Sequence, residues 1–137
     1  MIARIPDAFL DLLRGRAYGH FATLMPDGAP QLTPVWVDVE ETPAGHVLLV
    51  NSKRGRIKNR NVAARPQVAL EIQDPADPFR YLSVRGRVVA IVEEGAAEHL
   101  EALSQRYLGK PYPWWTPGEV REIFRIAPDR IRTAEIR

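Results

Sequence analysis

The 137-residue sequence contains no cysteine, which excludes disulfide bonds and thiolate metal sites. Its longest apolar runs, at 46–50 and 88–92, fall far short of the ~20 residues that a helix needs to cross a bilayer. The three histidines, His20, His46 and His99, lack the spacing of metal ligands. We therefore expect a cytoplasmic protein with no membrane partner and no metal site.

Recognisable catalytic patterns are absent as well. The sequence has no Ser–His–acid constellation and no glycine-rich dinucleotide fingerprint. The N-terminal stretch "MIARIPDAFLDLLRGR" mixes charged and apolar residues and lacks the apolar core of a signal peptide. No residue is assigned a catalytic role, which suits an enzyme only if a bound cofactor carries the chemistry.

The composition, with 45% apolar and 26% charged residues, is typical of a globular chain, and the length predicts a single domain over residues 1–137. Apolar periodicity and Gly/Pro punctuation predict a mainly β fold: a small antiparallel barrel or sandwich of five or six strands with short helices. Strands are expected at 18–25, 31–40, 47–51, 67–73, 80–94 and 120–136, and helices at 5–13, 54–64 and 95–108.

Two residues inside the expected strands require explanation. Pro34 cannot donate a hydrogen bond to a ladder, which indicates an edge, a bulge or a place where something other than a strand lies alongside. Gly86 indicates a bend in the long strand 80–94.

The segment 51–70, "NSKRGRIKNRNVAARPQVAL", concentrates positive charge. It holds six cations and no acid, which leaves 13 Lys and Arg against all 17 Asp and Glu elsewhere, a net charge of −4 outside the segment. A strand followed by a basic loop and a helix is a physically sensible anion receptor, because helix N-terminal N–H groups and cationic side chains both favour anions. Ser52 adds a hydroxyl, and Gly55 allows a close backbone approach.

Two other interpretations of this segment stay open. It can be a solvated cationic face without a ligand, the usual role of a charge run. It can also bind nucleic acid, but we do not expect this, because the segment has no aromatic residue for stacking on bases.

Two motifs extend the interpretation. "P-D-G-x-P-x-x-T-P-V-W" at 26–36 and "N-S-x-x-G-R-x-K-x-R-N" at 51–61 resemble the pyridoxamine 5′-phosphate oxidase-like split-barrel superfamily, and in particular its branch that uses the deazaflavin coenzyme F420. The resemblance covers almost the whole chain, including "YLGKPYPWW" and "FRIAPDRI". It implies a homodimer of six-stranded antiparallel split β-barrels of the FMN-binding type, with cofactor in two grooves between protomers.

The resemblance also implies cofactor-binding residues. The phosphate-binding positions are Ser52, Arg54, Arg56 and Lys58, with Asn51 and Asn59 beside them, and the positions along the tricyclic ring are Gln31, Thr33, Pro34, Val35 and Trp36. Trp36 suits the core equally well, because a strand tryptophan buries a large area. Further candidate pocket residues, without catalytic roles, are Tyr81, Arg85, Arg87, Tyr112 and Trp115.

The implied activity is that of an F420-dependent reductase, in which a hydride passes from the deazaflavin to a small electron-poor organic substrate. Two alternatives remain: an FMN-binding oxidase or reductase of the same fold, and a non-catalytic protein that binds or delivers F420. The apolar segment "YPWW" at 112–115 also favours a homodimer.

Overall fold

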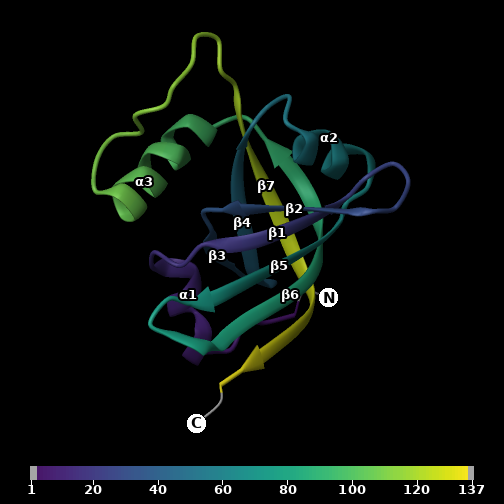
Figure 1. Ribbon diagram of the computed structural model, residues 1–137, viewed down its shortest axis with the longest axis vertical. Coiled ribbons are helices and arrows are strands. Elements are labelled where there is room, and N and C mark those ends of the chain that lie inside the picture. The colour runs from purple at the N-terminus through teal and green to yellow at the C-terminus, as the bar shows by residue number, and fades with distance from the viewer. Residues whose placement is uncertain (1–2, 136–137) are drawn as a thin grey trace.

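The computed structural model describes residues 3–135, which form one antiparallel sheet and three short α-helices (Figure 1). The strands follow the order β2-β1-β5-β6-β7-β4-β3. Their bounds are β1 Gly19–Leu24, β2 Pro30–Val35, β3 Asp38–Thr42, β4 Gly45–Lys53, β5 Gln67–Asp74, β6 Asp77–Val92 and β7 Arg121–Ala134. The helices are α1 Asp11–Arg14, α2 Ile57–Ala64 and α3 Ala96–Leu108, preceded by a 3₁₀ turn at Asp7–Phe9.

The sheet has seven strands where six were expected, because the segment 31–40 does not form one strand. It breaks at Trp36 and Val37 into β2, which pairs with β1, and β3, which pairs with β4. These two strands are the opposite ends of the strand order, yet Val35 and Asp38 are only three residues apart, at most roughly 11 Å. The sheet must therefore curl until its two edges nearly meet, which is the split-barrel architecture that the sequence predicted.

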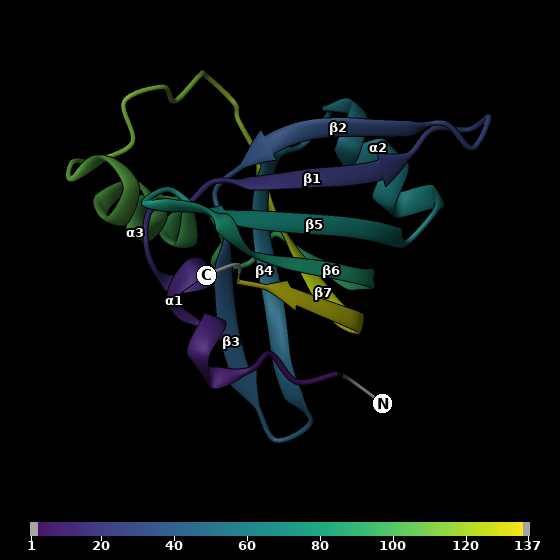
Figure 2. The same ribbon diagram turned by 60° about the horizontal axis from the view of Figure 1, so that its bottom comes forward.

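Figure 2 shows this curl, with β1, β2, β5, β6 and β7 side by side and β3 and β4 crossing behind them. The core fills the interior of the curl with alternate residues of each strand. Its fully buried side chains include Phe21, Leu48, Val50, Leu70, Ile72, Leu82, Phe124 and Ile126.

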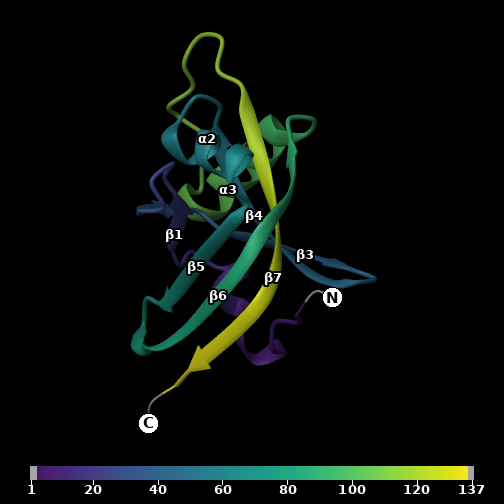
Figure 3. The same cartoon turned by 90° about the vertical axis from the view of Figure 1, so that its right-hand side faces the viewer.

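The helices lie at the two ends of the curled sheet (Figure 3). α2, α3 and the segment 109–120 gather at one end, and the N-terminal turns and the C-terminal end of β7 lie toward the other. The expected helix 5–13 is interrupted, with a 3₁₀ turn and one α-helical turn in its place. The expected helix 54–64 begins only at Ile57, because Gly55 has a φ of +98° that a continuing right-handed helix does not allow.

Two backbone expectations are confirmed with their physical causes. Pro34 lies on the edge strand β2, where a missing N–H costs no ladder bond. The register of β6 against β7 shifts between Arg85 and Gly86. A Cβ at Gly86 would lie 2.4 Å from the Ala127 carbonyl oxygen, so only glycine allows the two strands to approach at this bulge.

Candidate functional site

A cavity of about 180 Å³ opens where the ends of β2 and β4 meet α2, α3 and the segment 109–120. Three kinds of side chain line it: aromatic, aliphatic and cationic. They are Tyr18, Pro34, Val35, Trp36, Asn51, Ser52, Arg56, Lys58, Leu100, Leu103, Tyr112, Trp114 and Arg121. The cavity therefore joins the two motifs, which are separate in sequence.

Most of the residues inferred from the motifs meet at this cavity: Pro34, Val35, Trp36, Asn51, Ser52, Arg56 and Lys58. The remaining four, Gln31, Thr33, Arg54 and Asn59, do not line it. Gln31 and Thr33 lie further back on β2, where the Thr23 hydroxyl donates to Gln31 at 3.3 Å. Of the additional pocket candidates, Tyr112 lines the cavity, and Tyr81, Arg85, Arg87 and Trp115 do not.

Lys58 is the most unusual group in the site. Its side chain lies in the first turn of α2, the residue is only 7% exposed, and within residues 3–135 its ammonium has no anionic partner. Burial lowers the pKa of Lys58 to about 8, and the nearby charges of Arg56 and Arg121 act in the same direction. A buried cation beside two other cations costs folding free energy that an anion in the cavity would offset.

Arg56 and the helix start add to the positive potential at the same place. Arg56 is the N-cap residue of α2, and no side chain caps the N-terminal N–H groups of the helix. The positive end of the helix dipole therefore points toward the cavity wall that Arg56 and Lys58 form. Gly55 enables this turn through its left-handed φ, and a Cβ there would meet nothing within 4 Å. The expected close approach of the backbone to an anion at Gly55 stays a prediction.

Ser52 and Asn59 form a chain of hydrogen bonds behind the cavity. The buried Ser52 hydroxyl donates to Asn59 Oδ1 at 2.7 Å, and Asn59 Nδ2 donates to Glu122 Oε1 at 2.7 Å. Because the Ser52 proton is already donated, this hydroxyl offers a ligand only its acceptor lone pairs. Asn59 acts as support for the wall rather than as part of it.

Arg54 is held outside the cavity. It forms an ion pair with Glu93, and its Nε lies 3.7 Å from Glu122 Oε2. Its backbone N–H donates to the Val120 carbonyl oxygen. Arg54, expected as a phosphate-binding position, therefore does not line the cavity, because it pairs with acids from two other segments.

Arg121 is a cavity residue that the sequence did not single out. It is 8% exposed, its Nε donates to Asn51 Oδ1 at 2.9 Å, and its Nη1 donates to Glu119 Oε2 at 2.7 Å. Its guanidinium also lies over the Tyr112 ring, 5.7 Å from the centroid. The β4–β7 pairing places Arg121 opposite Lys53, and this long-range register has no local sequence pattern to reveal it.

Aromatic rings form the opposite wall. Trp36 stacks on Tyr107 with ring centroids 5.0 Å apart and an angle of 7° between the planes, and Tyr112 meets Trp36 edge-on at 6.3 Å. The segment that carries Tyr112 is tied to α3 through Glu101, which accepts from the Tyr112 N–H at 2.9 Å and from Trp115 Nε1 at 2.7 Å. These bonds lower the pKa of Glu101. Trp36 is thus both a wall of the cavity and part of an aromatic stack.

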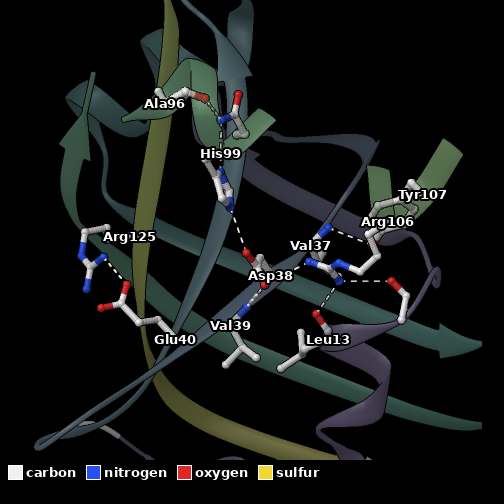
Figure 4. A network of polar contacts seen from close by, with 12 residues as sticks. Leu13, Val37, Asp38, Val39, Glu40, Ala96, His99, Arg106, Tyr107 and Arg125 are labelled. Atoms are coloured by element: carbon white, nitrogen blue, oxygen red, sulfur yellow. Dashed lines mark hydrogen bonds and ion pairs between the residues drawn. The ribbon is translucent and has the colours of Figure 1, made fainter. Parts of the chain in front are cut away.

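A polar network supports this wall from behind (Figure 4). His99 Nε2 lies 3.0 Å from Asp38 Oδ2, and Arg106 Nη2 lies 3.0 Å from Asp38 Oδ1. Bonds from His99 and from the Val39 N–H, together with the Arg106 charge, outweigh burial and lower the pKa of Asp38.

The network reaches the cavity through Asn51. Its Nδ2 donates to the Ala96 carbonyl oxygen at 2.8 Å and lies 3.2 Å from His99 Nδ1. Nδ1 of His99 therefore serves as an acceptor, and Nε2 carries the proton toward Asp38. The same amide accepts from Arg121, so the orientation of this arginine depends on groups outside the cavity.

Within residues 3–135, no three His, Asp or Glu side chains gather in a way that could hold a metal ion. No helix in that range is long and apolar enough to span a membrane. The cavity, with its cationic and aromatic walls, is therefore the candidate functional site.

The family model described as pyridoxamine 5′-phosphate oxidase matches residues 5–135. The chain belongs to this family. A solved structure called an F420 reductase is 35% identical, with a TM-score of 0.80, over 93% of this chain and 98% of that one. A comparison with curated protein sequences gives no match.

Two further solved structures share the fold of this chain. A conserved hypothetical protein from Mycobacterium tuberculosis is 25% identical with a TM-score of 0.70, over 98% of this chain and 86% of that one. General Stress Protein 26 from Bacillus anthracis is 22% identical with a TM-score of 0.63, over 90% and 88% of the two chains, and supports the fold alone.

Proposed function

We propose that this protein is an oxidoreductase that binds the deazaflavin coenzyme F420 in the cavity and passes a hydride to a small electron-poor organic substrate. The observation that carries the proposal is Lys58, a buried cation without an anionic partner in the first turn of α2, a helix whose N-terminus no side chain caps. The 35% identity to an F420 reductase supports the choice of coenzyme.

The residues present fit a planar cofactor that carries a phosphate. Lys58, Arg56 and Arg121 would bind the phosphate through charge-assisted hydrogen bonds. Pro34 offers no N–H on the edge of β2, so a flat ring can lie there without leaving a donor unsatisfied. Trp36, fixed by its stack on Tyr107, would keep the ring wall rigid. When bound, the deazaflavin would supply the hydride chemistry.

The protein's own task is then positioning and water exclusion. Glu101 holds the segment of Tyr112, Trp114 and Trp115 over α3, and two of these rings line the cavity. Aromatic side chains there would exclude water from the face on which the substrate reacts. No side chain of the described residues is assigned as a proton donor.

FMN is the second candidate cofactor, because the matching family model is that of pyridoxamine 5′-phosphate oxidase. Its phosphate suits the same cations. The two proposals separate when F420 and FMN are added individually to apo-protein and binding is followed by fluorescence. Tight F420 binding with substrate-dependent oxidation of the reduced coenzyme supports the proposal. Tight FMN binding with peroxide production overturns the choice of F420, and F420 binding without turnover on a broad substrate panel would identify a carrier.

We further propose a homodimer. The cavity of about 180 Å³ is smaller than the roughly 300 to 1,000 Å³ of most small-molecule sites, so one chain offers only part of a cofactor site. Leu32 is 65% exposed on the outward face of β2, beside a hollow of about 500 Å³ that extends from β1 to β7 and contains Leu24 and Val68. Light scattering at micromolar concentration should give twice the chain mass, and a monomer would contradict the shared site.

A further inference from the structure

Arg121 lies in the cavity against the repulsion of two other cations. Burial and the charges of Arg56 and Arg121 together lower the pKa of Lys58 to about 8. Because like charges repel, the Arg121 guanidinium would turn away from Lys58 unless other groups held it in place. Its Nε donates to Asn51 Oδ1 at 2.9 Å, and its Nη1 donates to Glu119 Oε2 at 2.7 Å. These two contacts hold Arg121 at the cavity wall.

The two contacts of Arg121 differ in what they leave to a ligand. The Glu119 carboxylate offsets part of the charge of Arg121, whereas the neutral Asn51 amide fixes the orientation of the guanidinium and leaves its charge unchanged. Within residues 3–135, no group takes Nη2 of Arg121, so this nitrogen remains for an anion. The direction in which Nη2 points therefore depends on Asn51.

The Asn51 amide is held on its other side by two acceptors. Its Nδ2 donates to the Ala96 carbonyl oxygen at 2.8 Å and lies 3.2 Å from His99 Nδ1. A flipped amide would point its oxygen at both acceptors and its N–H groups at the Arg121 donor. The flip is therefore unfavourable, and Asn51 Oδ1 stays directed at Arg121.

His99 can accept from Asn51 because Asp38 fixes the position of the His99 proton (Figure 4). Burial raises the pKa of Asp38, but its hydrogen bonds and the Arg106 charge outweigh burial and lower it. Asp38 is therefore ionised at neutral pH, and its Oδ2, 3.0 Å from His99 Nε2, requires a donor there. A proton on Nε2 leaves the lone pair of Nδ1 free to accept from Asn51.

We propose that His99 is a positioning residue: its Nδ1 fixes the Asn51 amide, and this amide holds the Arg121 guanidinium where it can bind an anion in the cavity. The contacts run from α3 through β4 to β7, and His99 itself does not line the cavity. The effect of His99 on F420 affinity rests on the function proposed above. Its effect on the orientation of Arg121 in the free protein does not.

Three substitutions of the full chain separate the two contacts of His99. His99→Ala removes both contacts. His99→Asn restores an acceptor oxygen near the position of Nδ1, toward Asn51, and His99→Gln restores an N–H group near the position of Nε2, toward Asp38. For each variant we would measure F420 affinity by fluorescence titration, stability by urea unfolding, and the NMR signal of the Arg121 Nε–H group in the free protein. Arg121→Gln assigns that signal by its loss.

We expect affinity and stability to be rescued by different variants. His99→Ala and His99→Gln should each weaken F420 binding about three- to tenfold, the range of one lost neutral hydrogen bond, and should shift or broaden the Arg121 signal. His99→Asn should restore the signal, and the affinity to within twofold of the unsubstituted protein, although it unfolds at lower urea than His99→Gln. In the Arg121→Gln background, His99→Gln should change the affinity less than twofold, because its effect passes through Arg121.

A purely structural role of His99 gives a different pattern. The proposal is overturned if affinity follows stability across the three variants, or if His99→Gln has its full effect on affinity in the Arg121→Gln background. It is also overturned if His99→Gln leaves the Arg121 signal unchanged. If the unsubstituted protein binds neither F420 nor FMN, the proposed function fails, and the Arg121 signal alone then supports or overturns the positioning role of His99.

Discussion

Lys58 and Arg54 lie four residues apart in the same basic segment, yet their surroundings are opposite. Lys58 and Arg56 line the cavity and have no anionic partner within residues 3–135. The other four cations of the segment are engaged. Lys53 donates to Thr116, Arg54 pairs with Glu93 and Glu122, Arg60 donates to the Gly55 carbonyl oxygen, and Arg65 donates to Leu24 and Asn61.

This difference distinguishes, within one basic segment, the cations that stabilise the fold from those that are available to bind a ligand. An engaged cation contributes to the fold through its partner, so its loss changes stability more than affinity. A buried cation without a partner destabilises the free protein, so its retention points to a ligand. By this criterion we assign ligand binding to Lys58. We add Arg56, which is exposed but lines the same cavity without an anionic partner, and Arg121 from β7, which lines the cavity although it also pairs with Glu119. The other four cations of the segment receive structural roles.

Lys58→Met is expected to give the largest effect. A lost charge-assisted hydrogen bond costs about 1.5 to 3 kcal/mol, which is about ten- to hundredfold in F420 affinity by fluorescence titration. The free energy of unfolding at pH 7 should stay equal or rise, because an apolar side chain replaces an unpaired buried charge. Weaker folding with unchanged affinity would place Lys58 among the structural cations instead.

Asp38→Asn tests the charged groups that already have partners within the protein. His99 and Arg106 would each lose a carboxylate partner, so urea unfolding should show a loss of about 1 to 3 kcal/mol. The control is Glu40→Gln, which breaks the ion pair with Arg125 at the surface and should cost at most about 1 kcal/mol. Equal losses for the two variants would mean that the network behind the cavity stabilises the fold no more than a surface ion pair does.

The pH dependence of binding distinguishes Lys58 from the arginines. Its pKa of about 8 means that the free protein loses this charge as the pH rises above 8, while below 8 the ammonium is already formed. Affinity for F420 should be flat between pH 6.5 and about 7.5 and then fall about tenfold per pH unit well above 8. The Lys58→Met variant should lack this decline. A decline that persists in the variant would assign it to another group.

Arg65→Ala should show the smallest effect, and only in stability. Its Nε donates to the Leu24 carbonyl oxygen at 2.8 Å and its Nη2 to Asn61 Oδ1 at 3.2 Å, so α2 would lose a tie to β1 worth about 1 kcal/mol. Thermal unfolding should detect this loss, whereas the F420 dissociation constant should change less than twofold. A tenfold change in affinity would extend the binding surface beyond the cavity.

Sequence patterns predicted what depends on neighbours in the chain. The apolar run before Asn51, the cations after it and Pro66 beyond them indicate a strand, a basic turn and a short helix, and the structure contains these elements. The motifs likewise selected Pro34, Ser52 and Lys58, which the fold brings to one cavity.

The remainder depends on contacts between distant segments. Arg54 is excluded from the cavity by Glu93, which follows 39 residues later, and Arg121 enters it through the β4–β7 register. The break at Trp36 that divides one expected strand into two follows from closing the curled sheet. None of these contacts has a local pattern, so reading along the chain could not predict them.

The most direct test of the account is the F420 affinity of Arg56→Gln beside that of Arg54→Gln, two substitutions of the same charge two residues apart, measured by fluorescence titration at one ionic strength. We expect at least a tenfold loss for Arg56→Gln and less than a twofold change for Arg54→Gln, because only Arg56 lines the cavity. Equal losses, or a larger loss for Arg54→Gln, would contradict a specific site at the cavity and would identify the segment as a diffuse cationic surface.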